Sequence, residues 1–481
     1  QRMASSMYNS IQHFIEFGTK KIEKRIREFI QEKKDLADLV LGLQEELNAL
    51  GRDITAEILE DMDDYLRNST SRKTHWEIVR KDRTEILTSF GPVSFERTYF
   101  KPKKGGKRQY LVDQIVGLNP HDRVSADVVI NVLEEAAESS YRKAGEKAAY
   151  MNEISKQAVM NKVHELEIVQ PAVKERKAET PKILYIEADE DHVSQQGKKY
   201  KTENEWGLSS TLMPKLVYVH EGIDHDKSTK NRKVLKNARY FGGIRDSEEL
   251  WLEVSKYIDD TYDIEKVETV YLSGDGAAWI KQGLQWIEKS KFVLDRYHLS
   301  RYVKTATAHL EDEDIELELE DALKEADKAQ LKKAFAKILE NTESETKKKA
   351  VNDAKKYILN NWAGIEIKVD NYEIVGCSAE GHVSHILSDR LSSRPMGWSK
   401  RGADKMSQLR IFKKNGGKVY DLVMAQKKKE QREQAHQLQD ELIREMRVRN
   451  GRYESVWNSN LTVLKKGNKT ALYSALRAIV G

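Results

Sequence analysis

The sequence has little cysteine and proline and no long apolar run. A single cysteine, Cys377, excludes an intramolecular disulfide and a zinc site built from several cysteines, and it is typical of a reducing compartment. Seven prolines argue against long disordered linkers. No segment approaches the roughly 18 consecutive apolar residues that a membrane-spanning helix needs, so we expect no membrane partner. The first residues lack the pattern of a secretion signal, which predicts a cytoplasmic protein.

Charge is abundant and unevenly distributed. Charged residues make up 33% of the 481 residues, which predicts large solvated surfaces on two to four domains. The net charge is only +4, yet there are 19 basic and 8 acidic residues from Lys400 onward, and six basic residues and one acidic residue at 96–110. These segments are candidates for contact with a polyanion, whereas residues 299–370, with 13 basic and 16 acidic residues, are expected to repel DNA. A solvated helix face is the alternative for any one run.

Hydropathy patterning predicts a helical N-terminal region followed by a small β-unit. Apolar residues keep near-helical spacing from Ile11 to about Leu66, and apolar and polar residues then alternate on both sides of a Gly91-Pro92 turn. Helical periodicity returns from Ser125 to Glu167 with a break near Tyr150. A helix, a turn and a second helix form the helix-turn-helix plan of DNA-binding proteins, although an ordinary bundle has the same pattern.

Beyond Pro181 the pattern becomes that of an α/β domain, in which short β-branched runs are mixed with helices. The expected strands are Ile183–Ala188, Leu216–His220, Val267–Gly274 and a strand-like Tyr372–Gly376, and the expected helices are Ser247–Tyr262, Leu299–Trp362, Ala379–Leu391 and Tyr420–Arg449.

Three acidic residues stand where a metal site can form. Asp189 and Asp275 each follow an apolar strand run, which places their carboxylates at the edge of a sheet. Glu380 opens a predicted helix, where the helix dipole favours an anion. Three converging carboxylates suit Mg²⁺, which prefers oxygen ligands and keeps waters that a phosphate can replace. An acid at a strand end is also a common helix cap, and Glu190 and Asp191 stand beside Asp189, so spacing leaves the first ligand open.

Four blocks of the sequence form a recognisable pattern. They are Tyr185-Ile-Glu-Ala-Asp-Glu-Asp-His-Val, Leu272-Ser-Gly-Asp-Gly-Ala-Ala-Trp-Ile, Leu294-Asp-Arg-Tyr-His-Leu and the segment that begins Gly376-Cys-Ser-Ala-Glu-Gly-His-Val. This pattern resembles the bacterial ISLre-two insertion-sequence transposases, which are similar to the Mutator-like DDE transposases. The block around Glu380 is the most specific, and the resemblance covers most of the chain.

The resemblance implies an α/β ribonuclease-H-like catalytic core with an α-helical insertion, preceded by a mainly helical N-terminal region with a small β-unit. The implied domains are a helical region at 1–80 with a role in dimerisation, the β-unit at 81–120, helix-turn-helix-like DNA-binding helices at 121–180, the core at 181–298 and 371–415, the insertion at 299–370 and a basic helical DNA-contacting region at 416–481.

The resemblance also implies the residues of the site. Asp189, Asp275 and Glu380 become the catalytic residues and would hold two Mg²⁺ or Mn²⁺ ions. Asp191 remains a rival ligand, because relatives often have Gly or Ala directly after the first Asp. The (Cys/Asp)-x-x-His signature of the Mutator-like group appears as Asp295 to His298, for which a structural hydrogen bond at a strand-to-helix junction is the alternative. A supporting role is likewise expected for His382, with packing inside the core as its alternative.

The expected function is therefore that of a DDE transposase, which cleaves DNA at transposon ends and transfers the 3′-hydroxyl into target DNA. Its partners would be double-stranded DNA, as terminal inverted repeats and target, and a second copy in a homodimer bound through the N-terminal helices, associated with the bacterial nucleoid. The alternatives are a metal-dependent nuclease or resolvase of the same fold and a domesticated, non-catalytic DNA-binding protein. The residues expected to contact DNA are Lys103, Lys104, Lys107, Arg108, Arg142, Lys156, Lys162, Arg390, Arg394, Lys400 and Arg401.

Overall fold

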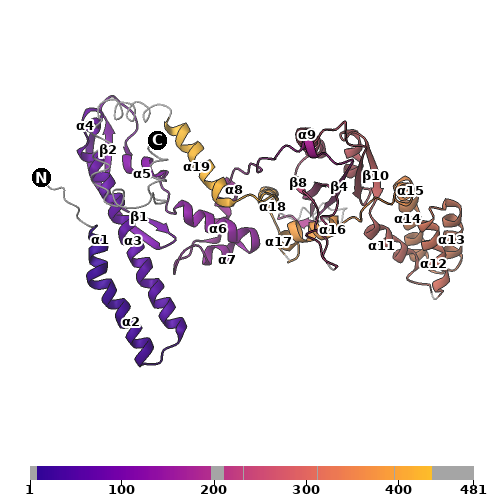
Figure 1. The fold of residues 1–481 in the computed structure, drawn as a ribbon, viewed down its shortest axis with the longest axis horizontal. Coiled ribbons are helices and arrows are strands. Elements are labelled where there is room, and N and C mark those ends of the chain that lie inside the picture. Colours follow the sequence, from indigo (N-terminus) through magenta and orange to yellow (C-terminus); the bar gives the residue numbers. More distant parts are fainter. Residues whose placement is uncertain (1–7, 197–210, 231, 311, 395, 436–481) are drawn as a thin grey trace, which may run out of the picture. The chain divides into compact units, whose positions relative to one another are not determined.

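The computed structural model describes residues 8–196, 211–230, 232–310, 312–394 and 396–435. Within these ranges the chain forms two compact units (Figure 1). Unit 1 contains the residues up to Glu167 together with the helix from Val419, and unit 2 is Ile168–Lys418. None of the described helices is both long enough and apolar enough to cross a membrane.

Unit 1 is mainly helical and contains a three-stranded sheet of order β1-β2-β3. This confirms the predicted helical N-terminal region and the hairpin around Gly91, whose φ of 109° is one that glycine adopts without strain. Its elements are α1 (Asn9–His13), the π-helix η1 (Phe14–Gly18), α2 (Thr19–Gln31), α3 (Leu36–Asn68), α4 (Thr70–His75), β1 (Trp76–Thr88), β2 (Gly91–Pro102), β3 (Gln109–Tyr110), α5 (Leu111–Val116), α6 (Ala126–Glu138), α7 (Tyr141–Glu146), α8 (Lys156–Glu165) and α19 (Val419–Ala435).

The long helix α3 is fixed to the sheet by its C-terminal half. Leu59 is buried with Phe95 of β2 in one apolar cluster. The carboxylate of Asp63 accepts hydrogen bonds from the backbone N–H of Thr98 at 2.9 Å and from its hydroxyl at 2.5 Å. Because Asp63 is fully buried, these hydrogen bonds offset the free-energy cost of removing its carboxylate from water. They also fix the position of α3 on β2.

The helices α7 and α8 form the predicted helix, turn and helix. Ser155 caps α8 by accepting a hydrogen bond from the N–H of Ala158. The two helices approach closely because Gly145 has no side chain: a Cβ there would overlap the carbonyl oxygen of Ile154. The arrangement is confirmed, whereas its contact with DNA stays a prediction.

Unit 2 contains a five-stranded mixed sheet of order β10-β9-β4-β7-β8. The central strand β4 pairs in parallel with β9 and antiparallel with β7, while β10 is parallel to β9 and β8 antiparallel to β7. The elements are the 3₁₀ turn η2 (Lys177–Glu179), β4 (Ile183–Glu190), β5 (Val193–Ser194), β6 (Thr211–Leu212), β7 (Lys215–His220), β8 (Arg239–Gly243), α9 (Ser247–Thr261), β9 (Thr269–Gly274), α10 (Ala278–Lys281), the 3₁₀ turn η3 (Gln282–Gln285), β10 (Ser290–Leu294), α11 (Arg296–Thr307), α12 (Glu313–Lys324), α13 (Lys328–Glu340), α14 (Glu345–Asn360), α15 (Trp362–Asp370), α16 (Ala379–Val383), the π-helix η4 (Ser384–Ser388), α17 (Asp389–Leu391) and α18 (Lys400–Lys414).

The two faces of β4 are covered by different parts of unit 2. Leu184 and Ile186 belong to a large apolar core that also contains α9 and the helices of 299–365. Successive side chains alternate between the faces, so Tyr185, Glu187 and Asp189 point to the other side. That side lies against residues 373–383, because the hydroxyl of Tyr185 donates to the carbonyl oxygen of Glu373 at 2.8 Å and the α16 helix packs on β4.

Most predicted elements of unit 2 are confirmed, with one correction. Tyr372–Gly376 is not a strand: the segment is irregular, and its residues bond to side chains of the sheet instead of joining it. The strands β8 and β10 and the helix α18 were not predicted. The predicted tail helix is confirmed as far as Ala435, and the rest of Tyr420–Arg449 lies outside the described residues.

Candidate active site

Three aspartates line up where the parallel strands end. The register pairs Glu187 of β4 with Ser273 of β9, so continuing it by two residues brings Asp189 beside Asp275. The register of β9 with β10 pairs Gly274 with Leu294, and one further residue brings Asp275 beside Asp295. Gly274 permits this approach, because a Cβ there would lie 2.9 Å from the carbonyl oxygen of Ala188. The carboxyl ends of β4, β9 and β10 therefore form one acidic edge.

The loop that carries Asp275 is held by the helical insertion. One carboxylate oxygen of Asp275 accepts from the N–H of Ala277 at 2.8 Å. Its carbonyl oxygen accepts from the hydroxyl of Tyr357, in α14, at 2.5 Å. Tyr357 in turn stacks on Tyr302 of α11, with ring centroids 3.7 Å apart. The insertion thus fixes the Asp275 loop through its own packing.

Glu380 lies in the first turn of α16, close enough to influence Asp189. Burial raises the pKa of Asp189 to about 7, and the negative charges of Glu380 and Glu190 also raise it. The hydrogen bond from the Glu190 N–H and the charge of His298 lower this pKa. Asp189 is 7% exposed, whereas the Glu380 side chain is exposed. Residues 191 positions apart are therefore brought to one site, and their carboxylates repel each other across it.

Asp295 and His298 form the predicted pair. Asp295 caps α11, and its other carboxylate oxygen lies 2.9 Å from Nδ1 of His298. This hydrogen bond raises the pKa of His298, and the charges of Asp189, Asp295 and Asp275 add to it. The structural contact at a strand-to-helix junction is confirmed, and it places the imidazole of His298 beside the acidic edge.

Asp191 has different surroundings from Asp189. Its Oδ1 accepts from the N–H of His192 at 2.9 Å and from the hydroxyl of Ser392 at 2.8 Å. Its Oδ2 is buried and has no hydrogen-bond partner in the described structure. The pKa of Asp189 is shifted by burial, by the hydrogen bond from the Glu190 N–H and by the charges of His298, Glu380 and Glu190, so Asp189 is the residue whose pKa responds to Glu380.

A buried polar network connects β4 to the segment in front of Glu380. Glu187 is 2% exposed, with its Oε1 3.0 Å from Nε2 of His220 and its Oε2 accepting from the hydroxyl of Tyr218 at 2.5 Å. The same Oε2 accepts from the backbone N–H of Ser378 at 2.5 Å. Ser378 directly precedes α16, so Glu187 ties the start of the Glu380 helix to the strand that carries Asp189. Sequence reasoning missed this residue, although an acid inside an apolar strand run was visible.

The helix of Glu380 contains a π-helical turn that a distant arginine supports. In η4 the backbone hydrogen-bond pattern is locally widened, a feature that frequently occurs at functional sites. Arg410 of α18 donates from Nε to the carbonyl oxygen of Ile386 at 2.5 Å and from Nη2 to that of His385 at 2.6 Å. Arg410 therefore gives two carbonyl oxygens of the π-helical turn a hydrogen-bond donor from another helix.

Replacing Arg410 with methionine is expected to destabilise the protein. Hydrogen bonds from a charged group contribute about 1.5–3 kcal/mol, and the bond to the Ile386 carbonyl is partly buried whereas the bond to the His385 carbonyl is exposed. Thermal unfolding should show a lower midpoint, whereas Arg401→Met, an exposed position of the same helix, should change the free energy of unfolding by less than about 0.5 kcal/mol. An unchanged midpoint for Arg410→Met would show that the turn is stable without it.

His382 and Arg390 depart from the sequence expectations. His382 stacks on Tyr218 with ring centroids 4.5 Å apart, and burial lowers its pKa to about 4, so it packs as a neutral ring in the core. Arg390 is only 5% exposed and lies over the ring of Trp398, so its guanidinium is enclosed by protein and does not form an open DNA-binding surface.

The other residues expected to contact DNA are at least partly solvent-accessible. Lys162 is half-buried and pairs with Glu165 at 3.3 Å, and Lys103 donates to the carbonyl oxygen of Lys73. The exposed ones are Lys103, Lys104, Lys107, Arg108, Arg142 and Lys156 in unit 1, and Arg394, Lys400 and Arg401 in unit 2.

The acidic edge suits a hard cation chemically but is not a closed cage. In the described part of the chain, no group of three or more His, Cys, Asp or Glu side chains is close enough to form a ready metal site. Carboxylates are the ligands that Mg²⁺ takes, and Mg²⁺ keeps several waters instead of requiring a complete protein cage. Burial is the largest cause of the raised pKa of Asp189, and a cation bound beside this carboxylate would favour its ionised form. The residues present therefore fit such an ion.

Fold and site together define a mixed α/β protein with a cluster of acids at the carboxyl edge of its sheet. A family model described as an uncharacterised protein family, UPF0236, matches residues 29–429. The chain belongs to the UPF0236 family. A UPF0236 protein of Caldanaerobacter subterraneus subsp. tengcongensis is 38% identical over 464 residues, which cover 96% of this chain and 95% of that protein.

Two further UPF0236 relatives and one solved structure are similar at different levels. A second protein of the same Caldanaerobacter, whose name joins eleven numbered designations, is also 38% identical over 464 residues, with 96% and 95% of the two chains covered. The UPF0236 protein in the vanSb 3′ region of Streptococcus gallolyticus is 25% identical over 417 residues, 82% of this chain and 86% of that protein. A chain of the Drosophila P element transposase strand transfer complex is 10% identical, with 74% and 91% covered and a TM-score of 0.21, too low to carry an argument.

Proposed function

We propose that this protein is a DDE-type DNA transposase that cleaves transposon ends and joins the 3′-hydroxyl to target DNA. The observation that carries the proposal is the acidic edge: Asp189 and Asp275 end neighbouring parallel strands, and the charge of Glu380 acts on Asp189 from a helix 191 residues further on. A five-stranded mixed sheet with its first strand in the centre supports the ribonuclease-H-like core that the resemblance to ISLre-two transposases implies.

The roles of the side chains follow from their positions. Asp189, Asp275 and Glu380 would hold two Mg²⁺ ions, which activate the attacking oxygen and stabilise the leaving oxygen of a phosphodiester. When protonated, which its raised pKa favours, His298 would place a positive charge beside the acidic edge and stabilise the charge of a bound phosphate. Asp295 orients that imidazole through the 2.9 Å hydrogen bond. Both cleavage and strand transfer are then phosphoryl transfers at one site, with no covalent protein intermediate.

The name of one relative adds independent support. It joins eleven numbered designations in one organism, which is expected if the same protein is encoded at many places in that genome. Multiplication within a genome is the outcome of transposition, and neither a housekeeping nuclease nor a structural DNA-binding protein requires it. The similarity of that relative covers 96% of this chain, so the argument concerns the whole protein.

The decisive experiment is incubation of the full chain with its own gene and flanking DNA, a supercoiled target plasmid and Mg²⁺ or Mn²⁺. A transposase should nick at defined positions outside the gene and produce joined molecules in which a 3′-end is linked to the plasmid. Chelation of the metal should abolish both products. Cut ends that never join would indicate the nuclease alternative, and binding without any cut would indicate the non-catalytic alternative.

Binding of DNA by unit 1 gives a separate prediction. Lys156 is exposed at the start of α8, the helix in the position that reads the major groove in helix-turn-helix proteins. Lys156→Gln should weaken binding similarly for all sequences and reduce the slope of log affinity against log salt by about 1, because one phosphate contact is lost. Lys348→Gln, in the net acidic insertion, should leave the slope unchanged. Fluorescence anisotropy at several salt concentrations would measure both, and an unchanged slope for Lys156→Gln would remove α8 from the interface.

A further inference from the structure

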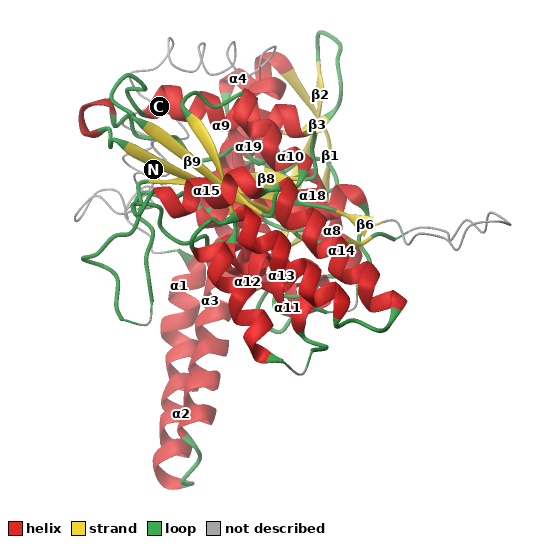
Figure 2. Cartoon of the chain, turned by 90° about the vertical axis from the view of Figure 1, so that its right-hand side faces the viewer, coloured by secondary structure: helices red, strands yellow, loops and turns green. Residues whose placement is uncertain are grey.

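The helical insertion that follows β10 is packed into the core of unit 2. Its helices α11, α12, α13 and α14 each contact the next one along the chain, and α14 returns to contact α11 (Figure 2). Phe335 of α13 and Ile358 of α14 belong to the same apolar cluster as Ile186 of β4. The insertion therefore shares one core with the strand that carries Asp189.

The connection that carries Asp275 is short and lies against the end of α14. It has only three residues, because β9 ends at Gly274 and α10 begins at Ala278. Its middle residue, Gly276, has a φ of 89°, which residues with a side chain rarely adopt. A Cβ there would also overlap Oδ1 of Asn361, the residue that follows α14. The connection is therefore fitted closely to the insertion.

Asp275 is held at two points, and the insertion supplies one of them. The hydroxyl of Tyr357, in α14, donates to the carbonyl oxygen of Asp275 at 2.5 Å. One carboxylate oxygen of Asp275 accepts from the N–H of Ala277 at 2.8 Å, within the connection itself. The carbonyl and the carboxylate belong to the same residue, so the Tyr357 hydrogen bond fixes the backbone from which the carboxylate projects.

Tyr357 is itself held by the helix that begins at the acidic edge. Its ring stacks on that of Tyr302 in α11, with ring centroids 3.7 Å apart and planes 19° from parallel. Asp295 caps the start of α11, and its backbone N–H donates to the carbonyl oxygen of Gly274 at 2.9 Å. These contacts close a circuit that runs from Asp295 along α11, across to α14 and back to Asp275.

The effect of the Tyr357 hydrogen bond is on geometry more than on burial. Both Tyr357 and Asp275 are half-buried, so burial alone does not require them to pair. Groups that orient metal ligands from behind matter in a different way, because their removal typically lowers metal affinity or activity by about 10–100-fold. A hydroxyl on a stacked ring, bonded to the backbone of an acid at the site, is placed to act in this way.

We propose that Tyr357 is a positioning residue for Asp275, so that the helical insertion sets the direction of one carboxylate that would hold a metal ion. This inference rests on the proposed function, because it concerns the same acidic site. It deepens that function by making the insertion part of the metal-holding unit. Tyr357 acts through Asp275 and needs no contact of its own with metal or DNA.

Titration of the full chain with Mn²⁺, followed by electron paramagnetic resonance, tests the inference directly, because bound Mn²⁺ loses the signal of the free ion. Tyr357→Phe removes one oxygen atom and keeps the stacked ring. It should raise the dissociation constant of Mn²⁺ by about 10-fold or more. Tyr302→Phe is the matched control. Its hydroxyl has no hydrogen-bond partner in the described part of the chain, so this variant should bind Mn²⁺ as the wild-type chain does.

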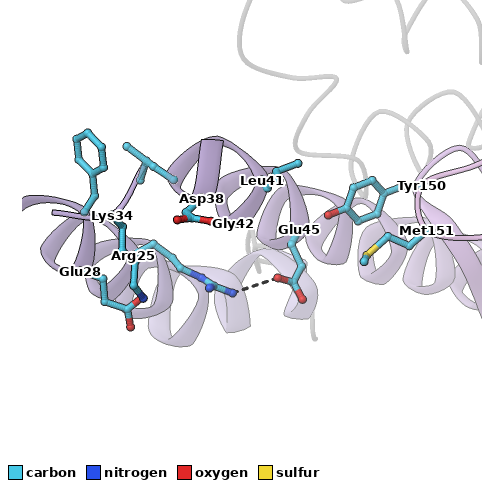
Figure 3. A pocket seen from close by; sticks show the side chains of 11 residues that line it. Arg25, Glu28, Lys34, Asp38, Leu41, Gly42, Glu45, Tyr150 and Met151 are labelled. Carbon is cyan, nitrogen blue, oxygen red and sulfur yellow. Dashed lines mark hydrogen bonds and ion pairs between the residues drawn. The ribbon is translucent and has the colours of Figure 1, made fainter. Parts of the chain in front are cut away.

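A cavity in unit 1 provides a control for Mn²⁺ that binds away from the acidic edge. It has a volume of about 450 Å³, and its lining includes Glu28, Asp38 and Glu45 together with Arg25 and Lys34 (Figure 3). Arg25 pairs with Glu45 at 3.1 Å, and Lys34 pairs with Glu28 at 2.9 Å. Glu45→Gln should therefore leave the Mn²⁺ affinity unchanged. A weaker affinity in this variant would place the measured ion in unit 1 and overturn the inference.

DNA cleavage gives a readout that a loss of stability would not reproduce. The Mg²⁺ concentration that gives half of the maximal rate should rise in Tyr357→Phe, and saturating Mg²⁺ should restore most of the wild-type rate. Affinity for DNA without metal, measured by gel shift, should stay the same. A rate that is lowered equally at every Mg²⁺ concentration would indicate a purely structural role and overturn the inference.

The outcomes separate this inference from the proposed function. Equal Mn²⁺ affinity in Tyr357→Phe and the wild-type chain would overturn the inference and leave the acidic site standing. Equal loss in Tyr357→Phe and Tyr302→Phe would also overturn it, because the hydroxyl bonded to Asp275 would then not be the cause. A wild-type chain that neither binds Mn²⁺ nor cleaves DNA would overturn the proposed function, and this inference with it.

Discussion

Asp189→Asn is expected to lower DNA cleavage and strand transfer by at least roughly 10²–10³-fold, the loss that follows removal of one preorganised charged or polar group from a reaction site. Asparagine keeps the shape of the side chain but removes the charge that the buried edge provides for a cation. Asp275→Asn and Glu380→Gln should have comparable effects, because the three acids act as one unit and their effects are not additive. Nick mapping and gel-shift assays on the same DNA would separate lost chemistry from lost binding.

Two controls make this result specific. Asp191→Asn should retain most of the activity if Asp189 is the first ligand, and a reversal of the two results would assign the position to Asp191. Glu268→Gln changes an exposed acid that pairs with Lys182 at the opposite end of the sheet, so it should have no effect. Full activity of Asp189→Asn would remove the basis of the proposed function.

In the absence of metal, Asp189→Asn should be more stable than the wild-type chain. The pKa of Asp189 in the folded chain is about 7, above its unfolded value near 4, so ionisation disfavours folding. This penalty is absent below pH 4, grows as the pH rises towards 7 and then levels off. Asp189→Asn should therefore raise the unfolding midpoint most at pH 7–8 and hardly at pH 4. A midpoint lowered at every pH would mean that Asp189 has a structural role.

The acidic site could be predicted from the sequence because its parts are local patterns. Asp189 and Asp275 each follow a run of apolar strand residues, and parallel neighbouring strands bring such ends together. Glu380 was a candidate because it opens a predicted helix, whereas Asp295 came from the resemblance, because an acid after a short run is just as often a cap or a loop residue. The structure adds the strand register that aligns the three aspartates. This register depends on pairing between strands that are far apart in the sequence.

The missed strand β8 (Arg239–Gly243) has only two residues, Tyr240 and Phe241, that indicate a strand. β8 ends in Gly242 and Gly243, which resemble a turn in sequence, yet a Cβ at Gly242 would overlap the carbonyl oxygen of Lys215 in the neighbouring strand. At Tyr372–Gly376, in contrast, apolar residues predicted a strand where the structure has none. Tyr185 and Tyr271 instead donate hydrogen bonds to Glu373, so side chains of the sheet take the place of a backbone ladder.

Long-range polar contacts were beyond sequence reasoning altogether. The helix Ala379–Leu391 was predicted correctly as a helix, but its π-helical turn accepts hydrogen bonds from Arg410, which lies 24 residues from Ile386. The partner of Glu187 is the backbone of Ser378, 191 residues away. No spacing rule connects such residues, because only the packed structure brings them together.

Glu187→Ala is expected to destabilise the protein by about 3–5 kcal/mol, because several buried donors lose their acceptor and each unsatisfied group costs about 1–3 kcal/mol. The substitution removes the carboxylate that His220, the Tyr218 hydroxyl and the N–H of Ser378 contact, and His220 and Tyr218 are fully buried. Glu187→Gln keeps an oxygen acceptor of the same size and should lose less. Chemical denaturation of the full chain would give the two free energies of unfolding.

The pH dependence separates the charge of Glu187 from its size. Burial alone would raise the pKa of Glu187, but the hydrogen bond and charge of His220, with the hydrogen bonds from Tyr218 and Ser378, bring it below its usual value. A lowered acid pKa stabilises the folded chain above the unfolded pKa, near pH 4, and this contribution is lost as the pH falls through the folded value. Glu187→Gln should therefore lose most stability at pH 6–7 and approach the wild-type chain at low pH. A difference between the two chains that is constant with pH would mean that the network is held by shape and not by charge.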